Sequence, residues 1–282
     1  MRIVGKRPRR ALYRKAKGAQ REKQLALRRL SPGRRKAPAF LILGAAKAGT
    51  TSLHHYLNEH PRISPPIIKE IHYFDHSYRR GLGWYLAHFP LNTVDGITGE
   101  ATPYYLFHPL VAQRVASDLP DARLIALLRN PIDRAVSHHN HELGDGYEDL
   151  PLEEAIERED ERLRGEEERI VADPGYKSFS HQHHSYLARG RYAEQLKRWF
   201  EHFDRDRILV LGAEELFEDP KSCAEQAQEF LGLRPVLPRD LSPRNDRSYA
   251  PVDTGLRKRL RAYFEPHNVR LYRLVGRDFG WK

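Results

Sequence analysis

Short apolar runs alternate with amphipathic stretches from residue 39 onward. Continuous apolar runs of this length are typical of parallel strands that are buried on both faces. Four runs predict strands, at Phe40–Leu43, Gly96–Thr102, Arg123–Leu128 and Arg207–Leu211. Helical spacing of apolar residues predicts helices near Thr50 and at about 109–118, 131–142, 152–165, 192–203 and 220–231. Because strands alternate with helices, we expect an α/β fold with a doubly wound parallel sheet flanked by helices.

The C-terminal residues are predicted to form two helices. Asp253 is placed to cap the first of them. The apolar positions of that helix include Leu256, Leu260 and Phe264. Pro266 has no backbone N–H and its ring clashes with the preceding turn of a helix. We therefore expect Pro266 to end the first helix before a shorter final one.

Acidic side chains dominate residues 148–168, with arginines interspersed. Glu154 and Arg158 lie four residues apart, and side chains at this spacing are neighbours on a helix surface. Asp160 and Arg164 have the same spacing. We interpret this segment as a solvated helix surface and not as a metal site.

The composition limits the kinds of protein that this chain can be. Its 282 residues are 40% hydrophobic and 30% charged, which is enough apolar material for a core and excludes general disorder. The single Cys223 excludes an internal disulfide framework and a multi-cysteine zinc site. No run approaches the roughly 18–20 apolar residues of a membrane span. The first residues lack the apolar region of a secretory signal, so we expect a cytoplasmic protein.

The positive charge of the chain is concentrated at its N-terminus. The net charge is +10, but residues 1–38 hold 15 Lys and Arg against one acid, Glu22. The other 244 residues therefore carry a net charge of −4. This distribution argues against a dedicated nucleic-acid site in the domain at 39–282. We expect residues 1–38 to be a flexible basic tail, or alternatively a patch for an anionic lipid, nucleic acid or polysaccharide.

The first motif with chemical meaning joins the first strand to its helix. Residues Gly44–Ser52 read Gly-Ala-Ala-Lys-Ala-Gly-Thr-Thr-Ser. Small residues let the backbone curl so that its N–H groups converge on an anion at the helix N-terminus. In a nucleotide-binding P-loop the lysine follows the last glycine, whereas Lys47 precedes Gly49 here. The loop therefore predicts a site for a phosphate-like group, with a plain tight turn as the alternative.

The second motif follows the strand that ends at Leu128. It begins with Arg129-Asn130-Pro131, and Pro131 is well placed to open a helix. Arg129 and Ser137, two helical turns further on, could hold one phosphate group. Ligands of an open parallel sheet collect at the carboxyl ends of its strands, where both motifs lie. The two motifs therefore suggest a ligand with two separated phosphate-like groups, although ordinary helix capping would also explain the second.

The third motif is Lys69-Glu70-Ile71-His72-Tyr73-Phe74-Asp75. In an extended segment Glu70 and His72 point to the same face, because one residue separates them. A carboxylate beside an imidazole, with Asp75 nearby, can form a general base and the groups that orient it. Charged loop residues without a chemical role are the alternative.

Histidines cluster in two further segments, as His138, His139 and His141 and as His181, His183 and His184. His138 and His141 could share a helix face. No carboxylate or cysteine completes a known metal-ligand spacing with them. We therefore expect no metal site among these histidines.

Together these motifs resemble the sulfotransferases that use 3′-phosphoadenosine 5′-phosphosulfate (PAPS). The matching segments, in chain order, are Lys47–Thr50, Lys69–Asp75, Gly81–Tyr85, Thr102–Tyr104, Leu127–Ser137 and Leu274–Trp281. The resemblance is greatest to the heparan sulfate 3-O-sulfotransferases and the N-sulfotransferase domains. It implies a sulfotransferase domain at 39–282 that transfers a sulfuryl group from PAPS to a hydroxyl or amine of a saccharide and leaves PAP.

The resemblance also implies which residues bind the donor. The loop Lys47–Ser52, which includes Ala48, Gly49, Thr50 and Thr51, would hold the 5′-phosphosulfate. Arg129 and Ser137 would hold the 3′-phosphate. Arg247 would add a third contact to an anionic group. No metal would be required, because lysine, arginine and backbone donors supply the positive charge.

The catalytic roles follow from the same resemblance. Glu70 would accept the proton of the acceptor, and Lys47 would stabilise the charge on PAP as it leaves. His72 and Asp75 would orient the acceptor and Glu70. Among the acidic and imidazole groups near the predicted sheet edge, His72, Asp75 and Glu100 are the other candidates for the base.

Two positions depart from the family pattern. The 3-O-sulfotransferases have an arginine at the position of Thr51, and the glycosaminoglycan branches have a lysine at the position of Ala101. These differences leave the acceptor open. A P-loop kinase and a protein that binds polyanions through residues 1–38 are the alternative functions, although the order of Lys47 and Gly49 argues against the kinase.

Overall fold

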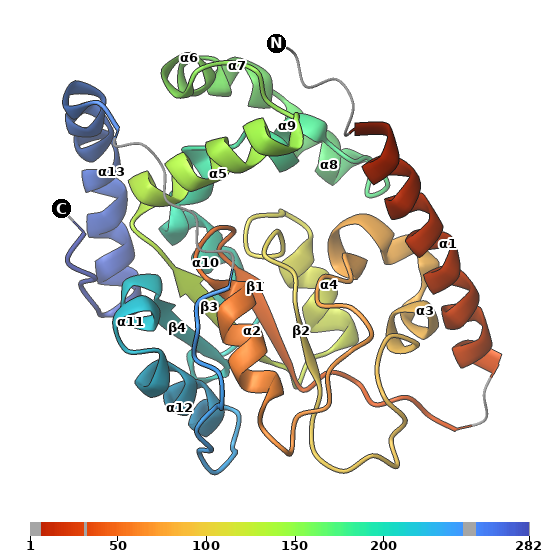
Figure 1. Ribbon diagram of the computed structural model, residues 1–282. Coiled ribbons are helices and arrows are strands. Elements are labelled where there is room, and N and C mark those ends of the chain that lie inside the picture. Colours follow the sequence, from red (N-terminus) through yellow and green to blue (C-terminus); the bar gives the residue numbers. More distant parts are fainter. Residues whose placement is uncertain (1–6, 31–32, 245–251, 282) are drawn as a thin grey trace.

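A parallel sheet of four strands lies at the centre of the computed structural model, which describes residues 7–30, 33–244 and 252–281 (Figure 1). The strands lie in the order β2 (Gly99–Ala101), β1 (Phe40–Gly44), β3 (Arg123–Leu128) and β4 (Ile208–Gly212). All residues of β1 are buried, as its continuous apolar pattern predicts. The predicted α/β fold is therefore confirmed, although β2 is shorter than the predicted strand at Gly96–Thr102.

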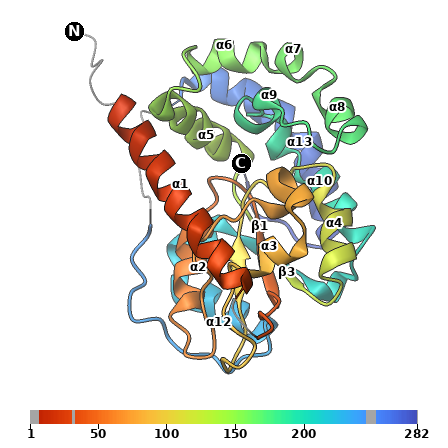
Figure 2. The same cartoon turned by 90° about the vertical axis from the view of Figure 1, so that its right-hand side faces the viewer.

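Helices cover both faces of this sheet, as Figures 1 and 2 show. The helices that connect or flank the strands are α2 (Thr50–Asn58), α4 (Val111–Asp118), α5 (Pro131–Asp145), α10 (Tyr192–Phe200), α11 (Ala213–Glu218) and α12 (Pro220–Phe230). Helix α2 contacts α12, and α4 contacts α10. In α10 the buried residues Tyr192, Leu196 and Trp199 recur at helical spacing, so this helix packs one apolar face against the core.

Helix α13 (Thr254–Val275) runs through Pro266 without a break. The predicted interruption at this proline is therefore wrong. The side chain of Asp253 accepts a hydrogen bond from the backbone N–H of Leu256 at 3.0 Å, which confirms the predicted cap. Buried residues on both sides of the proline, Phe264 and Leu271 among them, keep the helix packed. This packing offsets the hydrogen bond that a proline removes.

Residues 148–168 do not form one solvated helix. They contain α6 (Leu152–Glu157) and α7 (Glu159–Leu163) and enter α8 (Glu166–Ala172). The Glu154–Arg158 pair lies on the surface with its charged atoms 3.0 Å apart, as predicted. Glu159, however, is buried and accepts hydrogen bonds from the backbone N–H groups of Leu187 and Ala188. The purely solvated interpretation is therefore wrong, because this carboxylate holds a backbone turn that lies far from it in the sequence.

The basic N-terminal segment contains a helix, α1 (Arg7–Leu30), which lies beside α3 (Leu82–Leu86) in Figure 1 and contacts it. Leu25 is only 1% exposed and belongs to the main core. Glu22 and Arg80 form an ion pair with their nearest atoms 2.6 Å apart, and Arg28 donates a hydrogen bond to the Phe89 carbonyl. The expectation of a flexible tail does not hold for this docked part of α1. In the described part of the chain, no helix is both long and apolar enough to cross a membrane.

Candidate active site

A pocket of about 630 Å³ opens at the carboxyl ends of β1 and β3. Four parts of the chain contribute most of its walls: the β1–α2 loop, the segment around residues 69–72, helix α5 with α9 (Phe179–His183), and residues near 216–220 and 241–244. The sequence motifs therefore meet at one edge of the sheet, where open parallel sheets bind their ligands.

The β1–α2 loop curls through backbone conformations that favour glycine. Gly49 has a φ of +90°, and a Cβ added there would lie 3.0 Å from side-chain atoms of Leu216 and Phe217. Lys47 also has a positive φ, at 72°. The predicted donor-site residues of this loop that line the pocket are Lys47, Gly49, Thr50, Thr51 and Ser52. Ala48 is fully buried and packs in the core, so its contribution is to the shape of the loop.

The second motif follows β3, the strand next to β1, and leads into α5. Arg129 and Ser137 both line the pocket. A guanidinium N–H of Arg129 donates to the Lys47 carbonyl at 3.0 Å, which ties the two motifs together. Pro131 opens α5, and the Asn130 side chain caps it by accepting from the backbone N–H of Ile132 at 3.0 Å. Arg247 lies outside the described residues.

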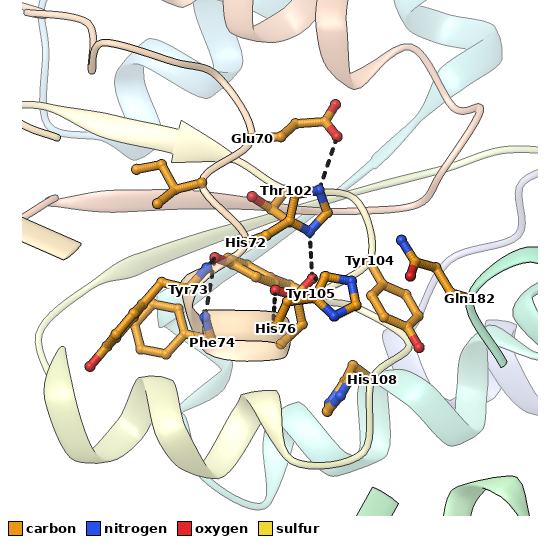
Figure 3. A network of polar contacts seen from close by, with 12 residues as sticks. Glu70, His72, Tyr73, Phe74, His76, Thr102, Tyr104, Tyr105, His108 and Gln182 are labelled. Carbon is orange, nitrogen blue, oxygen red and sulfur yellow. Dashed lines mark hydrogen bonds and ion pairs between the residues drawn. The ribbon is translucent and has the colours of Figure 1, made fainter. Parts of the chain in front are cut away.

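Glu70 and His72 lie side by side at the pocket wall, and Figure 3 shows the Glu70 carboxylate directed at the His72 ring. Glu70 Oε2 is 3.6 Å from His72 Nε2, and His72 Nδ1 is 2.7 Å from Asp75 Oδ2. The sequence pattern placed Glu70 and His72 on one face of an extended segment, but the segment is not extended. His72 adopts a left-handed conformation with φ 54°, and residues Tyr73–Ser77 form a π-helix. This turn brings the buried Asp75 back onto the His72 ring.

The charges of these three groups depend on one another. Burial lowers the pKa of His72, but Asp75 and Glu70 more than offset this and raise it to about 10. Burial raises the pKa of Glu70, yet its interactions with His72 and with the charge of Lys69 lower it to about 2. Near neutral pH, His72 is therefore a cation between two carboxylates. Such a cation has no lone pair to accept a proton, whereas the Glu70 carboxylate has.

Glu100 lies beneath this segment and is fully buried. Its oxygens accept hydrogen bonds from Tyr85 Oη (2.9 Å), Tyr105 Oη (3.0 Å), Thr102 Oγ1 (2.6 Å) and the backbone N–H of Ile71 (3.2 Å). Tyr105 Oη in turn accepts from the backbone N–H of Tyr73 at 2.9 Å. Burial raises the pKa of Glu100 to about 7. Enclosed in this way, Glu100 is a support for the backbone at 71–73 and not a candidate for the base.

Sequence reasoning missed Lys69, whose side chain also lines the pocket. Lys69 Nζ donates to Thr51 Oγ1 at 2.8 Å and to Glu70 Oε1 at 2.9 Å. It also missed Arg244, whose backbone N–H donates to Ser52 Oγ at 2.9 Å. The position of Lys69 directly before Glu70 could have indicated a role for it. Only the fold shows that the Lys69 side chain reaches Thr51.

The end of the pocket away from the β1–α2 loop was missed as well. It includes Tyr104, His141, Glu142, Gln182, His183 and Arg189. Glu142 pairs with two of the clustered histidines, since its carboxylate oxygens lie 3.2 Å from His138 Nε2 and 2.9 Å from His183 Nδ1. His183 is 41 residues away in the sequence, so no local spacing reveals this contact.

One group in the described ranges combines enough ligand atoms for a metal ion. These are His72, Asp75 and His76, whose nitrogen and oxygen atoms all lie within 4.8 Å of one another. Nδ1 of His72 already pairs with Asp75 in this group. A metal at this point would have to replace that contact, and the predicted mechanism without metal uses the contact instead.

Comparison with known proteins identifies the family of this chain. Residues 37–243 match the model of the sulfotransferase domain. The chain belongs to the sulfotransferase family. A crystal structure of a sulfotransferase from Alicyclobacillus acidocaldarius aligns with it at a TM-score of 0.72 and 34% identity, over 86% of this chain and 97% of that one. The sulfotransferase fold expected from the motifs is therefore confirmed.

Two relatives illustrate the branch to which this sulfotransferase is similar. Human heparan sulfate glucosamine 3-O-sulfotransferase 6 is 30% identical, over 89% of this chain and 75% of the human protein. Membrane-associated sulfotransferase kil1 of Dictyostelium discoideum is 28% identical, over 87% of this chain and 66% of that protein. This sulfotransferase thus spans about two thirds of the Dictyostelium protein. The resemblance to heparan sulfate sulfotransferases is confirmed.

Proposed function

We propose that this sulfotransferase transfers a sulfuryl group from PAPS to a hydroxyl or amine of a saccharide by in-line displacement, with Glu70 as the base. One observation carries the proposal. An ionised carboxylate beside a protonated imidazole faces the same pocket as a glycine-containing loop at a helix N-terminus. The carboxylate has lone pairs that can accept a proton, and the loop suits binding of a phosphosulfate group.

The donor would occupy the β1–α2 side of the pocket. Backbone N–H groups and the hydroxyls of Thr50, Thr51 and Ser52 would bind the 5′-phosphosulfate, with Lys47 close to the bridging oxygen. Arg129 and Ser137 would bind the 3′-phosphate. Because lysine, arginine and the helix N-terminus supply positive charge, the proposal includes no metal.

The transfer would replace the bond between sulfur and the bridging oxygen of PAPS by a new S–O or S–N bond to the acceptor. The acceptor oxygen or nitrogen forms a bond to sulfur while the bond from sulfur to the bridging oxygen breaks. The electron pair of the broken bond leaves on PAP, where Lys47 stabilises it. The proton of the acceptor moves to Glu70. His72, held by Asp75, keeps the Glu70 carboxylate oriented and ionised until then.

The acceptor class rests on the relatives. Those at 28–30% identity include enzymes named for heparan sulfate glucosamine, which supports a saccharide acceptor here. Thr51 and Ala101 depart from the pattern of those enzymes, so the proposal does not extend to heparan sulfate itself. A contact between the basic residues 1–38 and an anionic surface, and a cytoplasmic location, stay predictions of the sequence.

Thermal unfolding with different ligands tests the proposal. We expect PAP to raise the melting temperature by several degrees, because a ligand at 100 times its Kd adds about 2.7 kcal/mol to stability. ATP with Mg²⁺ and duplex DNA should each give a smaller shift. A larger shift with ATP would favour the kinase alternative, and a shift with DNA alone would favour a polyanion-binding protein. A screen of saccharides with ³⁵S-labelled PAPS would then identify the acceptor.

A further inference from the structure

Lys69 lies at the junction of the two halves of the pocket. Its ammonium group bridges the loop that faces the donor and the carboxylate proposed as the base, through the contacts at 2.8 Å and 2.9 Å described above. Its side chain is 20% exposed, so the ammonium group is confined and still open to the pocket. The backbone is held too, because the Lys69 carbonyl accepts a hydrogen bond from the N–H of Ala101 at 3.2 Å.

We propose that Lys69 is a further catalytic residue, whose ammonium group contacts the sulfuryl oxygens during transfer. This inference rests on the proposed function. Sulfur must travel from an atom held by the β1–α2 loop to an atom within reach of Glu70. A group that contacts Thr51 of the loop and Glu70 at the same time lies beside that path.

The chemistry of an ammonium group fits this role. It carries three N–H donors, and Thr51 and Glu70 accept two of them, so a third can reach a sulfuryl oxygen. During in-line displacement, the sulfuryl oxygens carry negative charge between the entering and the leaving atom. A fixed cation at this point stabilises the charge of the transition state more strongly than water would.

The surroundings of Lys69 agree with this role. Thr51 stands where the 3-O-sulfotransferases have an arginine and the N-sulfotransferases a threonine, and Ala101 stands where the glycosaminoglycan branches have a lysine. Both contact Lys69, Thr51 through its hydroxyl and Ala101 through its backbone. The ammonium group of Lys69 therefore places a positive charge beside Thr51, while Ala101 holds the Lys69 backbone. A role limited to holding the loop and the base segment together is the competing explanation.

Binding of PAP and PAPS separates these two explanations, because PAP lacks the sulfuryl group. We expect Lys69→Met to weaken PAPS binding by about 10- to 100-fold, the usual effect of losing a hydrogen bond to a charged group, and PAP binding by less than threefold. Lys197→Met, on the exposed side of α10, is the matched control and should change neither. Equal weakening of PAP binding and PAPS binding would assign Lys69 a structural role. No change in either affinity would show that Lys69 does not contribute to the site.

Turnover gives a second readout. Lys69→Met should lower kcat by about 10²–10³-fold, the range seen when one preorganised donor is removed. Lys69→Arg should retain part of the activity. Adding Thr51→Arg to Lys69→Met should restore activity at least tenfold by returning a cation to the loop. A double variant no better than Lys69→Met, in a protein that melts normally, would contradict the proposal. If wild-type protein binds neither PAP nor PAPS, the proposed function itself has failed.

Discussion

The two walls of the pocket are built in different ways. The β1–α2 wall, residues 44–52, consists of consecutive residues and presents backbone groups at a helix N-terminus. The base wall, residues 69–75, presents side chains that set one another's charge, and it is buried against and held by distant residues, Thr51 through Lys69 and Glu100 through the Ile71 N–H. A site for an anion can therefore be encoded locally, whereas a base needs the tertiary structure to set its protonation and its place.

Glu70 and Glu100 show the same contrast on a smaller scale. Both carboxylates belong to the base wall or its support, since Glu100 accepts the N–H of Ile71. The pKa of Glu70 is lowered to about 2, because the cations His72 and Lys69 outweigh the effect of burial. The pKa of Glu100 is raised to about 7 by burial, and its partners are neutral hydroxyl and N–H donors. The type of residue is the same, and the neighbours decide its chemistry.

The largest effect is expected from the base wall. Glu70→Gln keeps the size and hydrogen-bonding reach of the side chain but cannot accept the proton, so the rate should fall by about 10²–10⁴-fold. PAP affinity should be unchanged, because the donor lies on the other wall. Steady-state kinetics with an acceptor from the screen, together with PAP titration, measure both quantities. Activity retained in Glu70→Gln but lost in His72→Ala would move the base to His72.

The β1–α2 wall should show a somewhat smaller effect. Lys47→Ala removes one charged contact to the leaving group and should lower the rate by about 10²–10³-fold. The fold should persist, since Lys47 lines the pocket and is not part of the hydrophobic core. Turnover with PAPS and a melting curve check the two expectations. Near wild-type turnover would remove Lys47 from the mechanism.

The support beneath the base wall should influence stability in a pH-dependent way. The pKa of Glu100 rises from 4.5 to about 7 on folding, so the folded state retains a proton that the unfolded state loses between these values. The stability that this group contributes is therefore complete below about pH 4.5 and is lost as the pH rises through about 7.

Glu100→Gln removes this titration while keeping the shape of the protonated side chain. As the pH rises from 5 to 8, the unfolding free energy of the variant should increase relative to that of wild type by up to about 3 kcal/mol, because only wild type loses the contribution of Glu100. Urea unfolding of both proteins at the two pH values measures this difference. A difference in unfolding free energy between the two proteins that is the same at both pH values would contradict the titration of Glu100.

Removal of residues 1–36 should leave both walls unchanged. Leu25 and the Glu22–Arg80 pair contact α3 and its neighbours, and neither residue of α1 lines the pocket. PAP affinity and kcat should stay within about twofold. Loss of the buried Leu25 side chain should cost about 1.5–3 kcal/mol and lower the melting temperature by several degrees. Loss of PAP binding in a folded truncated protein would show that α1 supports the site.

The sequence alone determined much of the framework of this protein. Continuous apolar runs located the buried strands, and Pro131 located the start of α5. The sequence also predicted the anion-binding β1–α2 loop and the family. Each of these features depends on residues that are close in the sequence, because backbone conformation and capping are local properties.

The tertiary structure decided the rest. It placed Asp75 on His72 through a left-handed turn, brought Lys69 to Thr51, and enclosed Glu100. It also carried α13 through Pro266 and docked α1 on the domain. Apart from the Asp75–His72 contact, which spans three residues, these outcomes depend on burial and on contacts with distant parts of the chain. Local patterns do not encode such contacts, because the free energy of a buried group is set by the atoms that surround it.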